Sequence, residues 1–408
     1  MVATLKFANM QRSDFIDPST GILTPTIGKQ HAFVPAPLPP TIALGDIAIT
    51  MSEAMQAVGE LKGACRRFPN PYILVRPLQR QEALTSSAME GTFTTADNLL
   101  LAEVGVEKQG DDSTREVVNY LKALEGSLKL LKQIPISHRV ITSAHETLLS
   151  GLSTSRGASK RPGNYKSDQN WIGGATIDKA RFIPPPPKET QVCMDQLEAY
   201  LNREGSDFPT PLMDLALVHY QLEAIHPFAD GNGRVGRMLI SLMAVQRGML
   251  DIPILYMSPA LERHRDTYID LMYNVSARGE WAEWLNFFFK RIAESCREAV
   301  ATVDKLIDLQ VQYRTLAAKA GRSTSLLTLV DFLFERPAIT VPEAAKKLGV
   351  TYPAAKVVID KLLDQRILSP FEGQYPRVYF APGIIIASRP PSDTGLGEAL
   401  LQQPSVQA

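Results

Sequence analysis

The segment that decides the fold and the chemistry of this chain reads HPFADGNGRVGR and covers residues 226–237. It joins two apolar stretches with helical spacing, one ending at Ile225 and one running to Arg247. Gly231 and Gly233 allow the backbone to approach a ligand closely where the second helix begins. Free N–H groups and the positive end of a helix dipole attract anions. The segment therefore predicts an anion-binding loop between two apolar helices.

The polar side chains of the segment suit a nucleotide. Arg234 and Arg237 are three residues apart, so we expect them on one helix face, reaching oxygens of the same polyphosphate. Asp230 supplies the hard oxygen that Mg²⁺ prefers beside phosphates. His226 has an ordinary pKa near ~6.5 and is our candidate general base. Phe228 is expected to anchor the loop in the core.

Each of these residues also has a simpler structural explanation. A single histidine is commonly part of a core, a Gly-Asn-Gly is commonly a turn, and an arginine pair commonly forms surface salt bridges. A base, a metal ligand, an anion nest and two arginines nevertheless fall within residues 226–237. We therefore interpret them jointly as a nucleotide site, although spacing alone does not choose the reaction.

Composition sets wider limits. The 408 residues are too many for one hydrophobic core, so we expect two or three domains. Lys plus Arg equals Asp plus Glu at 43 each, which leaves no net charge to attract nucleic acid or an anionic membrane. No apolar run is long enough to span a bilayer. The cysteines are widely spaced and odd in number, so a reducing cytoplasm is expected; they are Cys65, Cys193 and Cys296.

The pattern along the chain predicts an all-α body with a small α+β module behind it. Residues 1–44 are expected to form an irregular, proline-rich strap, and helices are expected at 47–65 and 74–89. A Gly-rich and Pro-rich insertion at 157–187 interrupts later helices and holds a short hairpin near 171–177. We expect the parts to be a strap-and-helix region at 1–110, the body at 111–310, a module at 320–386 and a disordered tail at 387–408.

The C-terminal module has the pattern of a winged helix-turn-helix. Three helices are expected at 325–335, 341–348 and 352–365, followed by two strands near 367–371 and 377–380. Residues 340–343 read Thr-Val-Pro-Glu, a capping box with proline in the first turn. The third helix balances its lysines with aspartates, so it lacks the positive surface that DNA binding requires. We favour protein interaction or dimerisation over DNA binding.

Residues 226–237 resemble the Fic family, whose signature HPFx(D/E)GNGRxxR they match without a mismatch. The resemblance implies an all-helical core that transfers AMP from ATP to a Tyr, Ser or Thr hydroxyl of a protein and releases pyrophosphate. It implies that His226 is the base and that Asp230 is the Mg²⁺ ligand. It also implies ATP binding by Gly231, Asn232, Gly233, Arg234, Val235, Gly236, Arg237 and, at the adenine, Tyr268.

Two further features of the chain fit this resemblance. The related Doc toxins, which act as kinases, carry Lys where this chain has Gly233, so AMP transfer is favoured over phosphorylation. The insertion resembles the family flap, which pairs with an extended target segment. The flap residues are Asn170, Trp171, Ile172, Gly173 and Gly174. The alternative interpretation is an ordinary surface hairpin.

Upstream, residues 86–91 read SSAMEG and resemble the inhibitory (S/T)xxxE(G/N) motif of class II members of the family. Ser86, Glu90 and Gly91 hold its three defining positions. The resemblance implies that Glu90 pairs with Arg237 and occupies the donor that should hold the γ-phosphate.

Other functions stay open at this point. The same site could remove AMP or transfer another nucleotide-derived group, and the chain could be a DNA-binding regulator with a nucleotide-sensing body. We expect a target protein with a hydroxyl side chain, and self-modification or a homodimer also remains open. ATP and Mg²⁺ are the expected ligands, and no membrane partner is expected.

Overall fold

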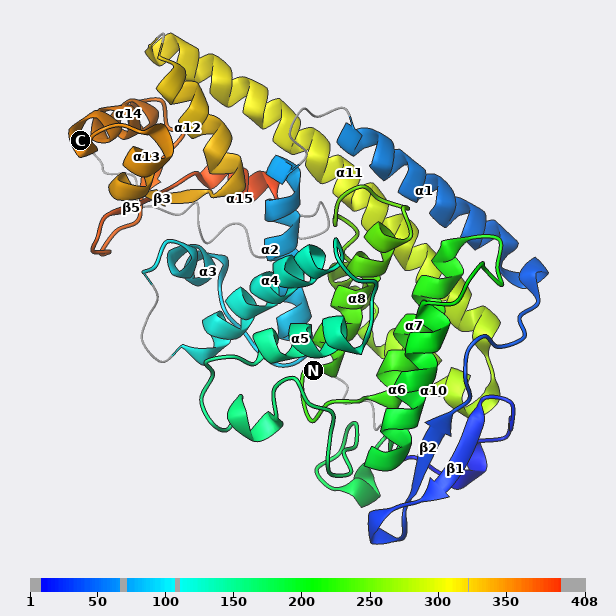
Figure 1. The fold of residues 1–408 in the computed structure, drawn as a ribbon. Coiled ribbons are helices and arrows are strands. Elements are labelled where there is room, and N and C mark those ends of the chain that lie inside the picture. Colours follow the sequence, from blue (N-terminus) through cyan, green and yellow to red (C-terminus); the bar gives the residue numbers. More distant parts are fainter. Residues whose placement is uncertain (1–8, 67–71, 107–110, 322, 390–408) are drawn as a thin grey trace, which may run out of the picture.

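The computed structural model describes residues 9–66, 72–106, 111–321 and 323–389 (Figure 1). The body is mainly helical and contains α1 (Ala48–Arg66), α2 (Tyr72–Met89), α3 (Ala96–Glu103), α4 (Asp112–Leu130), α5 (His138–Leu148), α6 (Pro187–Leu201), α7 (Pro211–Ile225), α8 (Asn232–Gln246), α9 (Ser258–Arg263), α10 (Arg265–Arg278) and α11 (Trp281–Ala320). The expected all-α body is thus confirmed. None of the helices in these ranges combines the length and apolarity needed to cross a membrane.

The helices α7 and α8 lie at the centre of the body. Almost every side chain of both is buried, including polar ones, because other helices cover them on several sides. Proline opens α7 at its first position, where no backbone donor is lost, and Thr210 caps it by accepting the N–H of Leu212. The loop between the two helices is therefore held at both ends by the core.

The longest element, α11, spans 40 residues and so extends about 60 Å at 1.5 Å per residue. It packs along α1 on one side and continues past residue 310, where a domain boundary was expected, into contact with the C-terminal module (Figure 1). The apolar residues of body and module belong to one continuous core. No break in packing separates the two parts among the residues described.

The N-terminal region differs from the irregular strap expected from its prolines. Strands β1 (Gly21–Pro25) and β2 (His31–Pro35) form an antiparallel hairpin, with Leu23 opposite Phe33. The sequence analysis missed this hairpin because Pro25 and Pro35 end the two strands and further prolines follow β2, and proline is confined to strand edges. The N–H of Phe33 donates to the carbonyl of Ile183, which attaches the hairpin to the insertion at 157–187.

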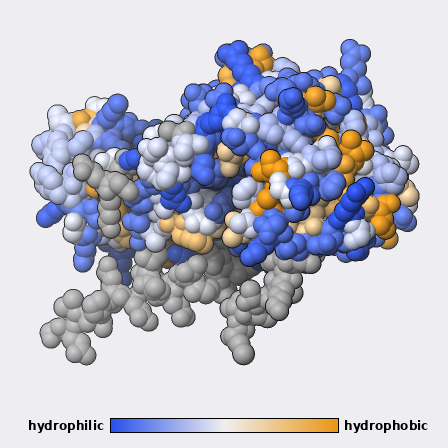
Figure 2. Space-filling view, turned by 90° about the horizontal axis from the view of Figure 1, so that it is seen from below, coloured by the Kyte–Doolittle hydropathy of each residue, from blue (hydrophilic) through white to orange (hydrophobic). Residues whose placement is uncertain are grey.

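Figure 2 shows the surface of the molecule as seen from below the view of Figure 1. It is mostly hydrophilic, with apolar residues interspersed among polar ones. Exposed apolar side chains of the N-terminal region are Ile16, Ile22 and Ile27. Scattered apolar residues of this kind are ordinary for a protein surface.

The C-terminal module contains α12 (Thr324–Glu335), β3 (Ala338–Thr340), α13 (Val341–Leu348), α14 (Tyr352–Asp364), β4 (Ser369–Pro370), β5 (Val378–Phe380) and α15 (Pro382–Ala387). Its sheet is antiparallel in the order β3-β5-β4. The capping box is present, since Thr340 and Glu343 exchange side-chain and backbone hydrogen bonds. The sequence did not predict β3 or α15. The assignment to the winged helix class stays a prediction, and most of the expected tail lies outside the described residues.

The module packs directly on α2 and α3. Arg80 of α2 donates to both carboxylate oxygens of Glu103, at 3.0 and 2.9 Å, and to the backbone carbonyl of Glu335 at 2.9 Å. A small apolar cluster beside this contact joins α3 to the sheet of the module through Leu100, Leu101, Ala338 and Val378. The helix that precedes Glu90 is therefore held between the body and the module.

A cavity introduced in α11 tests how much the shared core contributes. Phe288 is fully buried, with its ring centroid 5.3 Å from that of Trp284, so Phe288→Ala should lower the free energy of unfolding by about 3–5 kcal/mol. Val311 lies on the same helix but is 62% exposed, so Val311→Ala should change it by less than ~0.5 kcal/mol. Urea unfolding followed by circular dichroism measures both, and equal losses would contradict this assignment of the core.

Candidate functional site

The loop between α7 and α8 turns sharply at two positions. His226 adopts the left-handed conformation with φ 48° and ψ 60°, and Gly231 does so with φ 80° and ψ 6°. Asn232 closes the loop, because its Oδ1 accepts the N–H of Phe228 and its Nδ2 donates to the carbonyl of Phe228, both at 2.8 Å. The side chain of Asn232, expected at the nucleotide, therefore holds the loop itself together.

A histidine that sequence reasoning missed supports the loop from behind. The ring of His145 in α5 stacks on Phe228 with centroids 3.8 Å apart. Its Nε2 lies 3.0 Å from the carbonyl of Asp230, and its Nδ1 accepts the N–H of Gly163. Burial lowers the pKa of His145 to about 4, so the ring is neutral and donates through Nε2. The expected anchoring role of Phe228 agrees with this packing.

The start of α8 presents backbone N–H groups to a space that Glu90 already enters. Gly233 has no side chain there, and a Cβ at this position would overlap the Glu90 carboxylate. A carboxylate thus lies against the helix N-terminus, where anions are stabilised. Gly236 lies one turn further along α8, and a Cβ on it would overlap the carboxylate of Glu223. The absence of a Cβ at both glycines thus lets a glutamate carboxylate approach the helix backbone closely.

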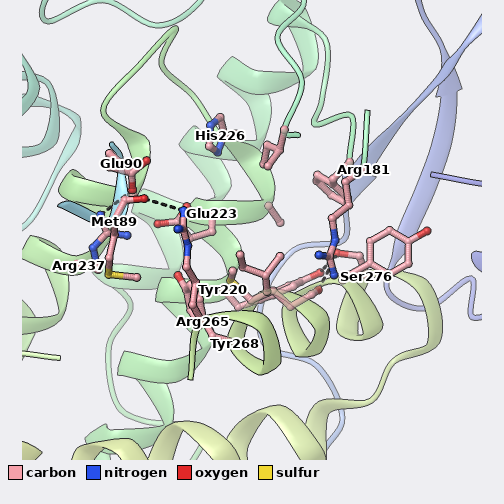
Figure 3. Close-up of a pocket in the computed structure, with 17 residues that line it drawn as sticks. Met89, Glu90, Arg181, Tyr220, Glu223, His226, Arg237, Arg265, Tyr268 and Ser276 are labelled. Atoms are coloured by element: carbon pink, nitrogen blue, oxygen red, sulfur yellow. Dashed lines mark hydrogen bonds and ion pairs between the residues drawn. The ribbon is translucent and has the colours of Figure 1, made fainter. Parts of the chain in front are cut away.

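Arg237 is the central cation of the site. Its side chain is 3% exposed and donates to the hydroxyl and the carbonyl of Ser86, each at 2.9 Å, and to Glu90 Oε1 at 2.7 Å. Figure 3 shows Glu90 and Arg237 side by side at one end of the pocket. Burial acts to raise the pKa of the Glu90 carboxyl, but Arg237 more than offsets this and the pKa is lowered overall. The expected pairing of these residues is present.

The end of α2 is built to present Glu90. The helix stops at Met89, whose carbonyl accepts a hydrogen bond of 2.8 Å from Arg265. Gly91 follows with φ 81°, a left-handed conformation that ends helices, and its N–H donates to Ala88. The Glu90 side chain keeps 33% of its exposure, so it reaches the pocket from a surface position.

Arg234 does not share the pocket with Arg237, contrary to the expectation that both reach one polyphosphate. Its Nη1 lies 2.6 Å from Glu116 Oε2 of α4, and both side chains are 3% exposed. Its Nη2 lies 3.2 Å from Asp230 Oδ1. Although three residues apart, the two arginines diverge because each has its own buried acceptor. Val235 likewise lies in the hydrophobic core.

Asp230 is partly exposed and accepts the N–H of Gly231 at 2.6 Å. No group of three or more His, Cys, Asp or Glu side chains comes together as a metal site in the described ranges. One carboxylate with nucleotide oxygens is nevertheless a usual arrangement for Mg²⁺, because that ion keeps several waters. The residues present are compatible with Mg²⁺ bound at Asp230.

A pocket with a cavity volume of about 190 Å³ opens beside the loop (Figure 3). It is lined by Met89, Glu90, Ile172, Arg181, Phe182, Tyr220, Glu223, Ala224, His226, Gly233, Arg237, Arg265, Tyr268, Ile269, Met272, Tyr273 and Ser276. The mainly apolar lining with a few polar groups is typical of small-ligand sites. The pocket brings together His226, Gly233, Arg237 and Tyr268 from the predicted set.

Two titratable groups of this pocket are strongly affected by burial. Burial and the neighbouring Lys166 lower the pKa of His226 to about 4, and its Nδ1 has no hydrogen-bond partner among the described residues. Burial raises the pKa of Glu223 to about 7, and Glu223 was not predicted as part of the site. Tyr268 is 4% exposed, and its hydroxyl lies 2.9 Å from His219 Nε2.

The segment expected to form the flap contains a single antiparallel bridge rather than a hairpin within 171–177. Ile172 donates to and accepts from Phe182, at 2.8 and 3.2 Å. Gly173 and Gly174 make the turn with φ near 70°, and a Cβ on Gly174 would overlap the carbonyl of Lys179. Trp171 is 37% exposed.

Asn170 departs from its expected place on the flap. Its Nδ2 donates to the carbonyls of His226 and Phe228, each at 3.0 Å, so its side chain points back to the loop instead of outward. Lys166, four residues earlier, was missed because nothing next to it in sequence marks it. Only the fold brings Lys166 to within 3.0 Å of the His226 carbonyl.

Loop closure by Asn232 can be tested through stability. Asn232→Ala leaves the buried N–H of Phe228 without its acceptor and removes one of the two side-chain donors to the Phe228 carbonyl, so the free energy of unfolding should fall by about 1–3 kcal/mol. Asn164→Ala, at an exposed position, is the matched control and should change it by less than ~0.5 kcal/mol. Urea unfolding measures both, and an unchanged Asn232 variant would show that the loop holds without it.

Comparison with known proteins places this geometry in context. The Fic/DOC family N-terminal model matches residues 49–129, and the Fic/DOC family model matches residues 135–244. Proteins named "Protein adenylyltransferase Fic" from Drosophila sechellia and Drosophila melanogaster are 29% identical over 200 residues. That match covers 48% of this chain and 37% of each relative, so the chain aligns with well under half of their length.

Solved structures share the fold. A Fic family protein from Desulfovibrio desulfuricans G20 is similar with a TM-score of 0.54 at 19% identity, over 84% of this chain and 98% of that one. Fic-1 from C. elegans is similar with a TM-score of 0.51 at 19% identity, over 63% and 74% of the two chains. Residues 49–244 thus belong to the Fic/DOC family, with a Fic N-terminal domain followed by a Fic domain.

Proposed function

We propose that this chain is a protein adenylyltransferase that transfers AMP from ATP to a hydroxyl side chain of a protein. The observation that carries the proposal is the convergence of His226, Arg237 and the open backbone of Gly233 on one pocket. The pocket is partly open, and Glu90 and Arg237 lie together at one end of it (Figure 3). The relatives named as adenylyltransferases support the same reaction.

In this reaction the target hydroxyl oxygen attacks the α-phosphorus, and His226 takes the hydroxyl proton. A new P–O bond forms, the bond to the bridging oxygen breaks, and pyrophosphate leaves with the electron pair. Arg237 and the N–H groups at the start of α8 are placed to neutralise the charge of the phosphates. Mg²⁺ held by Asp230 would supply further charge neutralisation.

The protonation state of His226 suits a base. Because burial and Lys166 lower its pKa to about 4, the imidazole is neutral at pH 7 and free to accept a proton. Its left-handed backbone places the side chain at the end of α7, facing the pocket. The ring is therefore available over the whole neutral pH range.

We infer that Glu90 inhibits this reaction. Its carboxylate pairs with Arg237 and overlaps the space above Gly233, which are the two features that a terminal phosphate would use. A bound ATP would meet a like charge there and lose the Arg237 donor. Glu90 is partly exposed, so its side chain can leave without moving α2.

The flap supports a protein as the acceptor. Ile172, Arg181 and Phe182 line the pocket beside His226, and the bridge between Ile172 and Phe182 gives a short extended edge. An extended target segment could add to such an edge by backbone hydrogen bonds, which would align a hydroxyl without demanding much target sequence. Asn170 is left out of this surface, because it faces the loop.

The role of the C-terminal module is inferred from its charges. Lys356 forms an ion pair with Asp360 on α14, which offsets one of the two lysines of that helix. This arrangement favours contact with protein over contact with nucleic acid. We therefore retain a protein-interaction or dimerisation role for the module.

The first test is transfer of label from ATP labelled at the α-phosphate or at the γ-phosphate. Glu90→Gly should raise α-label transfer by about 10- to 100-fold, because freeing a charge-assisted donor is worth about 1.5–3 kcal/mol. His226→Ala in the same background should abolish transfer. Glu372→Gly, at an exposed turn, is the matched control and should leave the rate unchanged. Entry of γ-label alone would make the chain a kinase and refute the proposal.

The metal assignment is tested separately. Asp230→Ala in the Glu90→Gly background should lower transfer by about 10- to 100-fold, with part of the loss recovered at high Mg²⁺. Asp168→Ala, which removes the carboxylate of an exposed aspartate, is the matched control and should not change the rate or its Mg²⁺ dependence. Rates are measured across a Mg²⁺ titration, and an unchanged Mg²⁺ dependence in the Asp230 variant would remove Asp230 from the metal site.

A further inference from the structure

A buried lysine lies directly behind the general base. Lys166 is 5% exposed, and its Nζ donates to three oxygens: Asn170 Oδ1 at 2.7 Å, the carbonyl of Ile225 at 3.2 Å and the carbonyl of His226 at 3.0 Å. No carboxylate pairs with it among the residues described. A buried cation without a counterion is costly, so its position needs an explanation.

Lys166 and Asn170 together satisfy four consecutive carbonyls, 225 to 228. The Nζ of Lys166 takes the first two, and its backbone N–H donates to Pro227 at 2.8 Å. Asn170 Nδ2 takes the carbonyls of His226 and Phe228. These carbonyls lie just where α7 stops and the chain turns left-handed at His226, so helix bonds cannot satisfy them.

The charge of Lys166 matters as well as its donors. The C-terminal end of a helix carries partial negative charge, which stabilises a cation at the end of α7. The ammonium also acts on the His226 ring and lowers its pKa, together with burial. Glu90 and Asp230 act on the ring in the opposite direction, and Cys193 of α6 is the titratable neighbour of Lys166.

We propose that Lys166, with Asn170, is a positioning residue that fixes the backbone of His226 and keeps its imidazole in the proton-accepting form. This role rests on the proposed transfer reaction. Lys166 does not touch the pocket, so it acts only through His226. Burial lowers the pKa of Lys166 itself to about 7, yet it is protonated in the acidic range where His226 titrates.

The variants separate charge from geometry in the Glu90→Gly background. Lys166→Met removes the charge and the hydrogen bonds of the ammonium. Asn170→Ala removes three side-chain hydrogen bonds, one of them from Lys166, but keeps the charge, and Lys166→Arg also keeps the charge. Lys179→Met, an exposed lysine of the same insertion, is the matched control. Circular dichroism confirms folding, and Lys166→Gln replaces the methionine variant if that one does not fold.

We expect Lys166→Met to lower kcat by about 10- to 100-fold with the KM for ATP within about twofold, because the base and not the nucleotide is misplaced. Loss of the positive charge raises the pKa of His226. Because a protonated ring cannot act as base, the acidic limb of the pH profile then moves to higher pH. Asn170→Ala should lower kcat without moving that limb, and Lys166→Arg should restore most of the rate.

The His226 ring is also titrated directly, by NMR of protein with isotope-labelled histidine, with His226→Ala as the assignment control. A higher pKa in Lys166→Met than in its parent supports the inference, and an unchanged pKa with an unchanged pH profile overturns it. If the Glu90→Gly parent transfers no label, the proposed function fails instead, and the ring titration still decides whether Lys166 tunes His226.

Discussion

The burial of the Arg237 guanidinium is the constraint on which the arrangement of this site depends. A cation that is 3% exposed must be surrounded by acceptors, or the fold would not tolerate it. Ser86 and Glu90 supply them from the end of α2, which fixes that helix against α8. In the proposed reaction, Glu90 and a nucleotide phosphate would therefore compete for this one arginine.

The turn between α7 and α8 brings His226 and the start of α8 close to Arg237, where we propose that the reaction takes place. Both helices are buried, so the loop must reverse the chain within a few residues, and it does so by left-handed conformations at His226 and Gly231. The turn leaves a row of carbonyls on one side and free N–H groups on the other. Cationic Lys166 donates hydrogen bonds to two of these carbonyls, and the N–H groups at the start of α8 form the proposed anion site. The proposed base and the proposed phosphate site thus both result from the same chain reversal between α7 and α8.

Features set by neighbouring residues could be predicted from the sequence, whereas features set by contacts between distant parts of the chain could not. The loop, its glycines and the helices around it carry their pattern locally, and the Glu90–Arg237 pair followed from a family resemblance. Lys166, His145 and Glu223 could not be found in this way, because their roles arise from contacts that only the fold creates. The N-terminal hairpin was missed for another reason, since its two short strands lack an alternating pattern and prolines lie within and after β2.

Arg234 shows the limit of spacing arguments. Two arginines three residues apart share a helix face, but the acceptors around them decide where the guanidinium groups go, and Glu116 draws Arg234 away. The long helix α11 contributes no residue to the proposed active site. It nevertheless packs against α1 of the body and against α12 of the C-terminal module. Body and module share its buried face and one continuous core. Neither can lose its packing without exposing apolar surface of the other, so the two should melt in a single cooperative transition despite their different architectures.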